Sequence, residues 1–87
     1  MRSGIYCITN SVTNKLYVGS SCQIPTRWSQ HKSRLRANKH SNTYLQAAWN
    51  KYCEDVFLFS VLEYCMPESL LDSEDYWIQK LEVLNQA

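Results

Sequence analysis

The chain has 87 residues, a net charge of +1, and a composition that is 45% hydrophobic and 13% aromatic. This length allows one modest core, and this composition excludes an intrinsically disordered chain. No apolar run approaches the roughly 18 residues that cross a bilayer, and the N-terminal MRSGIYCITN lacks the apolar stretch of a secretory signal. We therefore expect one folded, intracellular domain over residues 1–87, with no membrane partner.

The first predicted element is a β-hairpin. Residues 3–9 and 15–20 alternate in the manner of strands, and NSVTN between them forms a turn of about five residues. The hairpin holds Tyr6 and Tyr17 on neighbouring strands, and both glycines of the chain, Gly4 and Gly19, lie two residues from one of them. Because aromatic residues are common in strands, either tyrosine taken alone is expected to be a core residue.

A helix is predicted next, over about residues 24–38. Its apolar stripe recurs at spacings of four, three and four, with Pro25 in the first turn, and consists of Ile24, Trp28, His31 and Leu35. His31 has Arg27 four residues before it and Arg34 three residues after it. A histidine on such a stripe is either a hydrogen-bonded core residue or a functional one.

The second half of the chain continues with three elements. We expect a helix at about 42–52 capped by Ser41 or Asn42, a strand at 56–64, and a helix at about 67–81 beginning near Pro67. The order ββααβα predicts an α+β domain with one three-stranded antiparallel sheet flanked by helices. The tryptophans lie on helical apolar stripes and are expected in the core: Trp28, Trp49 and Trp77.

A carboxylate interrupts the apolar stripe of the last helix. Glu74 completes the i, i+3, i+4 spacing of a stripe formed by Leu70, Leu71, Trp77, Ile78 and Leu81. A carboxylate facing a core is costly unless it is paired or binds a cation. Glu74 therefore either pairs with a nearby Lys or Arg at the edge of the stripe or ligates a cation.

Charge is distributed unevenly along the chain. Residues 1–53 hold eight basic side chains and no acid, whereas residues 54–87 hold all eight acids and one lysine. A basic half with interleaved aromatic residues is typical of a surface that faces a polyanion. A solvated helix face whose charge is balanced in space by the acidic half explains the pattern equally well.

The cysteines do not form a metal-binding pattern. Cys7, Cys22, Cys53 and Cys65 stand too far apart for the Cys-x-x-Cys pairs of structural zinc sites. We expect four buried, apolar thiols.

Five sequence elements together resemble a known nuclease family. They are GIY at residues 4–6, YVG at 17–19, Arg27 and His31 within RWSQHKSRL, and Glu74 within SEDYWIQKL. Their order and separations are similar to those of the family named for its GIY and YIG motifs, above all the catalytic domain of phage homing endonucleases. Val18 replaces the isoleucine common in the second motif, which is a conservative exchange. The resemblance covers almost the whole chain.

The resemblance implies a metal-dependent DNA endonuclease that hydrolyses phosphodiesters with one metal ion. Glu74 would ligate Mg²⁺ or another divalent cation such as Mn²⁺, and Arg27 would contact phosphate oxygens. One motif tyrosine would accept a proton from the attacking water while the other orients that water, and we favour Tyr6 over Tyr17 as the base. His31 would hydrogen-bond a tyrosine hydroxyl or a phosphate.

Other residues receive supporting roles from the same resemblance. The glycines Gly4 and Gly19 would keep the backbone open to a phosphate or a neighbouring strand, and Asn85, expected after the last helix, would brace the site. His40 matches a histidine of homing members, and an exposed residue at the start of a helix is the alternative. The residues expected to contact DNA phosphates are Arg27, Lys32, Arg34, Arg36, Lys39 and His40.

The small size and modest charge imply little sequence specificity of the domain's own. Homing members continue into a linker and a DNA-binding region, so a separate module would select the target, and whether this chain is a fragment stays open, as does its oligomeric state. A catalytically silent nucleic-acid-binding module of the same fold is the alternative function. A protein-interaction domain is disfavoured because the sequence shows no large apolar surface patch.

Overall fold

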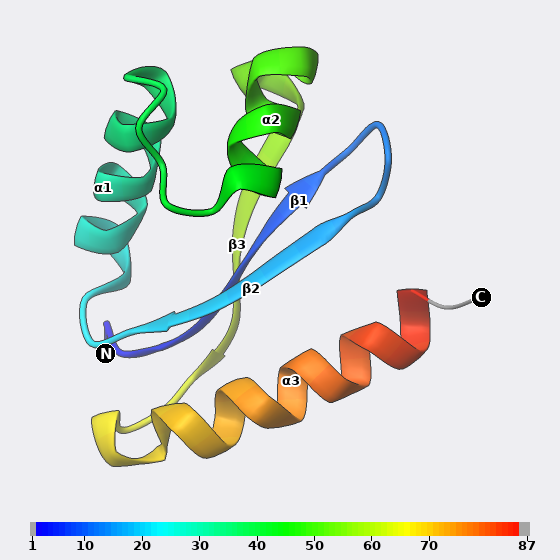
Figure 1. Cartoon of the computed structure of the whole chain (residues 1–87). Helices are drawn as coiled ribbons and strands as arrows, with labels where there is room; N and C mark the ends of the chain where they lie inside the picture. The colour runs from blue at the N-terminus through cyan, green and yellow to red at the C-terminus, as the bar shows by residue number, and fades with distance from the viewer. Residues whose placement is uncertain (1, 86–87) are drawn as a thin grey trace.

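The computed structural model describes the backbone of residues 2–85 and the side chains of residues 2–81. The element order is ββααβα, as predicted (Figure 1). The strands are β1 (Gly4–Asn10), β2 (Leu16–Ser21) and β3 (Phe57–Tyr64), and the helices are α1 (Ile24–Arg36), α2 (Thr43–Tyr52) and α3 (Leu70–Asn85). Short 3-10 turns at Glu54–Val56 and Pro67–Ser69 precede β3 and α3.

The sheet has the strand order β2-β1-β3, with both pairs antiparallel. Successive side chains of a strand point to opposite faces, so Tyr6 and Ile8 of β1 share one face. Helices α1 and α2 cover that face, and α3 runs along the other side of the sheet (Figure 1). The main core lies under α1 and α2 and consists of Tyr6, Ile8, Ile24, Leu35, Leu45, Trp49 and Phe57.

Two asparagines fix the local turns. The buried side chain of Asn10 accepts hydrogen bonds from the backbone N–H groups of Val12 and Thr13, at 2.9 and 3.2 Å, which closes the hairpin turn. Asn42 is the N-cap of α2, and its Oδ1 accepts from the N–H of Leu45 at 3.0 Å. Of the two predicted caps, the structure therefore selects Asn42 over Ser41.

The last helix differs from the prediction at both ends. Pro67 begins a 3-10 turn, and α3 itself starts at Leu70 and continues to Asn85 instead of ending near residue 81. Residues 68–87 contain no glycine or proline that would stop a helix. Asn85 is thus the last helical residue and does not follow the helix, and its side chain lies outside the described residues.

Some of the residues expected in the core are exposed. Cys7 is buried and Cys65 half-buried, but Cys22 and Cys53 are exposed, which corrects the expectation of four buried thiols. Cys22 lies in the turn between β2 and α1, and Cys53 ends α2 with a positive φ of 72°, so neither is on an apolar face.

The three tryptophans also differ in whether they belong to the core. Trp49 is buried and Trp28 packs against the core, as predicted. Trp77 is outside the core cluster, and its Nε1 donates to Glu63 at 2.9 Å on the far face of the sheet. None of the helices in the described part of the chain is long and apolar enough to cross a membrane.

Candidate active site

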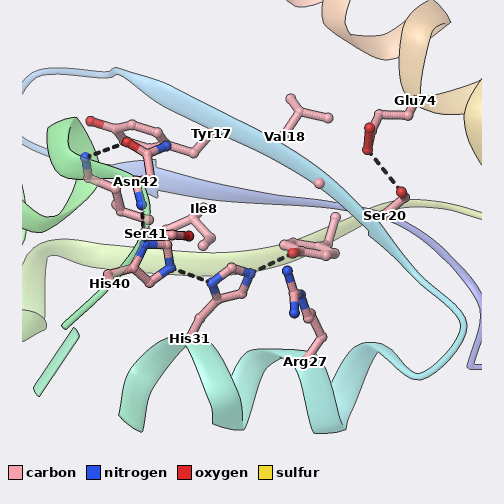
Figure 2. Close-up of a pocket in the computed structure, with 13 residues that line it drawn as sticks. Ile8, Tyr17, Val18, Ser20, Arg27, His31, His40, Ser41, Asn42 and Glu74 are labelled. Atoms are coloured by element: carbon pink, nitrogen blue, oxygen red, sulfur yellow. Dashed lines mark hydrogen bonds between the residues drawn. The ribbon is translucent and has the colours of Figure 1, made fainter. Parts of the chain in front are cut away.

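A pocket of about 270 Å³ opens at the edge of the sheet, around β2. Figure 2 shows side chains from α1 and from the loop before α2 on one side of this strand, and Glu74 of α3 on the other. The pocket is lined by Tyr6, Ile8, Tyr17, Val18, Gly19, Ser20, Arg27, His31, His40, Ser41, Asn42, Leu45 and Glu74. Because β2 is an edge strand, groups from both faces of the sheet reach the same pocket.

Gly19 lets the ring of Tyr6 lie across β2. The two residues are direct partners in the β1–β2 register. A Cβ added at Gly19 would lie 2.6 Å from both Cζ and Oη of Tyr6, far inside a normal contact. Gly4 has a different reason to be glycine, since its Cβ would meet the backbone of Glu63 and Tyr64 on β3. Gly4 therefore permits close packing of β1 on β3, which is the neighbouring-strand role expected of it.

A chain of hydrogen bonds links Tyr6 to the loop before α2. His31 Nε2 lies 2.6 Å from Tyr6 Oη, and His31 Nδ1 lies 2.7 Å from His40 Nε2. The N–H of Asn42 donates to His40 Nδ1 at 3.0 Å. Figure 2 shows these contacts as a continuous row of dashed lines. His31, which was expected either in the core or at a functional site, thus points into the pocket.

Burial and nearby cations keep both histidines neutral. The pKa of His31 is lowered to about 4, mainly by burial and then by the charges of His40, Arg27 and Arg34. Burial also lowers the pKa of His40, with Arg34 and Arg27 adding to the effect. At neutral pH the pair therefore supplies hydrogen bonds and no positive charge.

Both motif tyrosines are protonated in the free protein. Burial raises the pKa of Tyr6, the adjacent Arg27 guanidinium opposes that rise, and Glu74 adds to it. Burial also raises the pKa of Tyr17. Of the two, Tyr6 has the arginine neighbour that stabilises a phenolate.

Glu74 projects from α3 toward β2. Its Oε1 accepts a hydrogen bond from Ser20 Oγ at 2.9 Å. The alternative in which Glu74 pairs with a basic side chain is not what the structure shows, because the one ion pair among the described residues joins Arg36 to Glu54. Within the same residues, no group of three or more His, Cys, Asp or Glu side chains could hold a metal ion. Glu74 is the one carboxylate lining the pocket.

The predicted phosphate-binding residues separate into two groups. Arg27 and His40 line the pocket, and the exposed Arg34 is near enough to lower the pKa of both histidines. By contrast, Arg36 donates to both carboxylate oxygens of Glu54 at 2.8 and 2.6 Å. Lys32 lies over the ring of Phe59, 4.9 Å from its centroid, and Lys39 is exposed outside the pocket lining.

Lys32, Lys39 and Arg36 therefore do not join the pocket. The pairing of Arg36 with Glu54, an acid from the second half of the chain, agrees with the interpretation of a balanced helix face.

Sequence reasoning missed Ser20 and Asn42 as members of this site. Ser20 follows the YVG motif on β2. Its hydroxyl contacts Glu74 because α3 packs against β2, which the sequence does not reveal. Asn42 was identified as a cap, and its backbone N–H is the group that contacts His40.

The chain belongs to the GIY-YIG family, because the family model described as the GIY-YIG catalytic domain matches residues 2–85. This confirms the resemblance seen in the sequence. Among curated proteins, the chain is 40% identical over 83 residues to Intron-associated endonuclease 1 of Enterobacteria phage T4. It is 39% identical over 72 residues to Probable intron-encoded endonuclease 1 of Neurospora crassa. The matches cover 93% and 83% of this chain but only 34% and 22% of those longer proteins.

Solved structures give the same result for the fold. The catalytic domain of the homing endonuclease I-TevI superposes with a TM-score of 0.84 at 36% identity, covering 92% of this chain and 88% of that one. A mutant of the I-TevI catalytic domain also gives 0.84, at 37% identity, covering 94% and 86%. The predicted α+β fold is therefore confirmed, and the chain is a nuclease domain related to homing endonucleases.

Proposed function

We propose that this domain is a divalent-metal-dependent DNA endonuclease that hydrolyses phosphodiesters with one metal ion. The observation that carries the proposal is the convergence of a tyrosine, an arginine and a carboxylate on one pocket at the sheet edge, from β1, α1 and α3. These are the groups that phosphodiester hydrolysis needs for proton transfer, charge stabilisation and metal binding.

Glu74 would hold the metal. Its Oε1 accepts from Ser20, which orients the carboxylate at the wall of the pocket. Mg²⁺ prefers hard oxygen ligands and commonly binds through one carboxylate, several waters and substrate phosphate oxygens. A lone carboxylate therefore fits Mg²⁺ or Mn²⁺ and does not fit zinc, which takes three or four protein ligands. When bound, the metal would stabilise negative charge on the phosphate and the leaving oxygen.

Arg27 would bind the phosphate undergoing cleavage. It lines the pocket from α1, and its guanidinium has the geometry for two parallel hydrogen bonds to phosphate oxygens. Its Nη1 donates to Gln30 Oε1 at 3.4 Å, a long contact that a phosphate can replace.

Tyr6 would be the general base. The attacking water forms a bond to phosphorus as the bond from phosphorus to the 3′ oxygen breaks, the phenolate of Tyr6 takes the proton of the water, and the 3′ oxygen takes a proton from solvent. Tyr6 is favoured over Tyr17 because Arg27 lies beside its hydroxyl and opposes the effect of burial on its pKa. Since the free phenol is protonated, the reaction should accelerate as pH rises.

The substrate would be DNA, selected by a separate module. The curated relatives are endonucleases of which this chain spans about a third and a fifth. A pocket with Arg27 and a few nearby charges can hold one phosphate but offers little surface for reading bases.

The proposal is tested with supercoiled plasmid incubated with the chain and Mg²⁺. We expect nicked or linear product that requires the metal and disappears with a chelator. Glu74→Ala should abolish cleavage, whereas Asp75→Ala, which removes the exposed neighbouring carboxylate on the same helix, should leave it unchanged. Plasmid that binds at low salt yet stays uncut at every protein concentration would instead support the silent binding module.

A further inference from the structure

The loop between α1 and α2, residues 37–42, is held in place by a buried glutamine. Gln46 is only 8% exposed, which is costly for an amide unless it is hydrogen-bonded. Its Oε1 accepts from the backbone N–H of His40 at 3.1 Å. Its Nε2 donates to the carbonyl of Leu35 and to Asn50 Oδ1, both at 3.0 Å. The loop is therefore anchored to both helices at the residue that carries the imidazole.

The direction of the hydrogen bonds follows from one fixed donor. The N–H of Asn42 can only donate, so His40 Nδ1 must accept and carries no proton. Neutral His40 then carries its proton on Nε2 and donates to His31 Nδ1. Neutral His31 in turn carries its proton on Nε2 and donates to Tyr6 Oη.

We propose that His40 is a positioning residue, which fixes the Nε2–H tautomer of His31 so that the Tyr6 oxygen receives a hydrogen bond and directs its own proton into the pocket. The catalytic consequence rests on the proposed nuclease function, whereas the tautomers do not depend on it.

The second neighbour of Tyr6 supports this direction. Arg27 has donors and no acceptor, so neither it nor the Nε2–H of His31 can receive the phenolic proton. The same two donors stabilise the oxygen once that proton has left. The fixed tautomer thus favours the phenolate that the proposed base requires.

The same geometry argues against His40 as a phosphate ligand. Both of its ring nitrogens are engaged, one by Asn42 and the other by His31, so no ring N–H is left for a phosphate. Burial and the charges of Arg34 and Arg27 keep the ring neutral. The earlier expectation that His40 contacts DNA is replaced by a role through His31.

Protonating His31 would break the arrangement. A proton on its Nδ1 would face the Nε2–H of His40 across 2.7 Å, which is donor against donor. The groups that face His31 from its surroundings are Tyr6 on β1, His40 on the loop, and Arg27 and Arg34 on α1, and none is an acid. The low pKa of His31, about 4, agrees with this environment.

The tautomers can be read directly by long-range proton–nitrogen NMR of the nitrogen-15-labelled chain, without DNA, at about pH 7.5. The chain has only two histidines, and His40→Gln assigns both signals. We expect the Nε2–H tautomer at both His31 and His40. A bare Nε2 with a protonated Nδ1 at His31 would overturn the proposal whether or not the domain cleaves DNA.

A matched pair of variants tests the consequence. The longer amide of His40→Gln can still donate to His31 Nδ1, while that of His40→Asn is too short to reach it. We expect the His31 tautomer and kcat to be retained in the Gln variant. In the Asn variant we expect mixed tautomers and a kcat lower by about tenfold with KM unchanged, a loss typical of a partner that orients a functional histidine.

Two other results would contradict the role. Equal increases in KM and equally reduced salt dependence in both variants would make His40 a phosphate contact. Equal thermal destabilisation of both variants, with the His31 tautomer and kcat unchanged, would make it a purely structural residue. If the wild-type chain shows the expected tautomers but no cleavage, the proposed function fails while the hydrogen-bond assignment stands.

Discussion

Gly19→Ala should damage the site more than the fold. The added methyl would lie 2.6 Å from Cζ and Oη of Tyr6, whereas carbon atoms pack at about 3.5 Å, so the ring must retreat by about 1 Å. Tyr6 is 4% exposed and packs edge-on against Trp28, with ring centroids 6.2 Å apart, which leaves little room for that movement. The same movement would disturb the 2.6 Å hydrogen bond between Tyr6 Oη and His31 Nε2.

The expected cost follows from these contacts. Overpacking of this kind costs about 1–3 kcal/mol and the lost hydrogen bond about 1 kcal/mol, so the free energy of unfolding should fall by about 2–4 kcal/mol. A 1 Å misplacement of a reacting group costs about 100-fold in rate. Urea unfolding measures the first effect, and plasmid cleavage at a temperature where the variant is folded measures the second.

A double-mutant cycle separates the two causes. In a Tyr6→Phe background the hydroxyl and its hydrogen bond to His31 are already absent, so Gly19→Ala should lower the rate much less than in the wild type. Equal rate losses in both backgrounds, or a stable Gly19→Ala variant with full activity, would refute the argument that Gly19 exists to accommodate Tyr6.

Three further predictions concern charge and protonation. The folded-state pKa of His31, about 4, lies below the ordinary histidine value of 6.5, so the unfolded chain binds more protons and stability should fall as pH drops from about 7 to 4. The full pKa shift corresponds to about 3 kcal/mol, and because the ring is half exposed we expect the free energy of unfolding to fall by about 1–2 kcal/mol. Urea unfolding at several pH values measures this loss, which should be smaller in the His31→Gln variant. Arg27→Lys keeps the charge but loses the two-point contact with phosphate, and it should lower kcat/KM by about 10- to 100-fold. A kcat/KM equal to that of the wild type would count against phosphate binding by Arg27. Between about pH 7 and 9 the cleavage rate should rise about tenfold per pH unit. Tyr6→Phe should abolish this pH dependence and Tyr17→Phe should keep it. The reverse pattern would identify Tyr17 as the base.

The fold was largely predictable because its elements carry strong local signals. The β-branched and aromatic residues of β3 and the helical spacing of α1 determine those elements without tertiary information. The end of α3 was predicted too early, since residues 68–87 lack the glycine or proline that marks a helix terminus.

Two residues of the candidate site could be predicted because each is a polar residue on the apolar stripe of a helix. Glu74 and His31 were identified because each interrupts an apolar stripe, and the structure brings both to the pocket. Ser20 and the loop that carries His40 could not be predicted, because their roles depend on how α3 and α2 lie against the sheet.

The ion pair between Arg36 and Glu54 could not be predicted from the sequence either. Arg36 and Glu54 stand 18 residues apart, and only the packing of the short 3-10 turn near the end of α1 makes them partners. The structure pairs Arg36 with Glu54 and brings Arg27 to the pocket, a division that the basic cluster in the sequence does not show.

The most direct test of the account is a crystal structure of the chain with a non-cleavable DNA duplex and a divalent cation. We predict the cation on Glu74, a backbone phosphate in contact with Arg27, and the Tyr6 oxygen facing the water in line with the scissile bond. DNA bound on another face of the domain, or a cation ligated away from Glu74, would contradict the account.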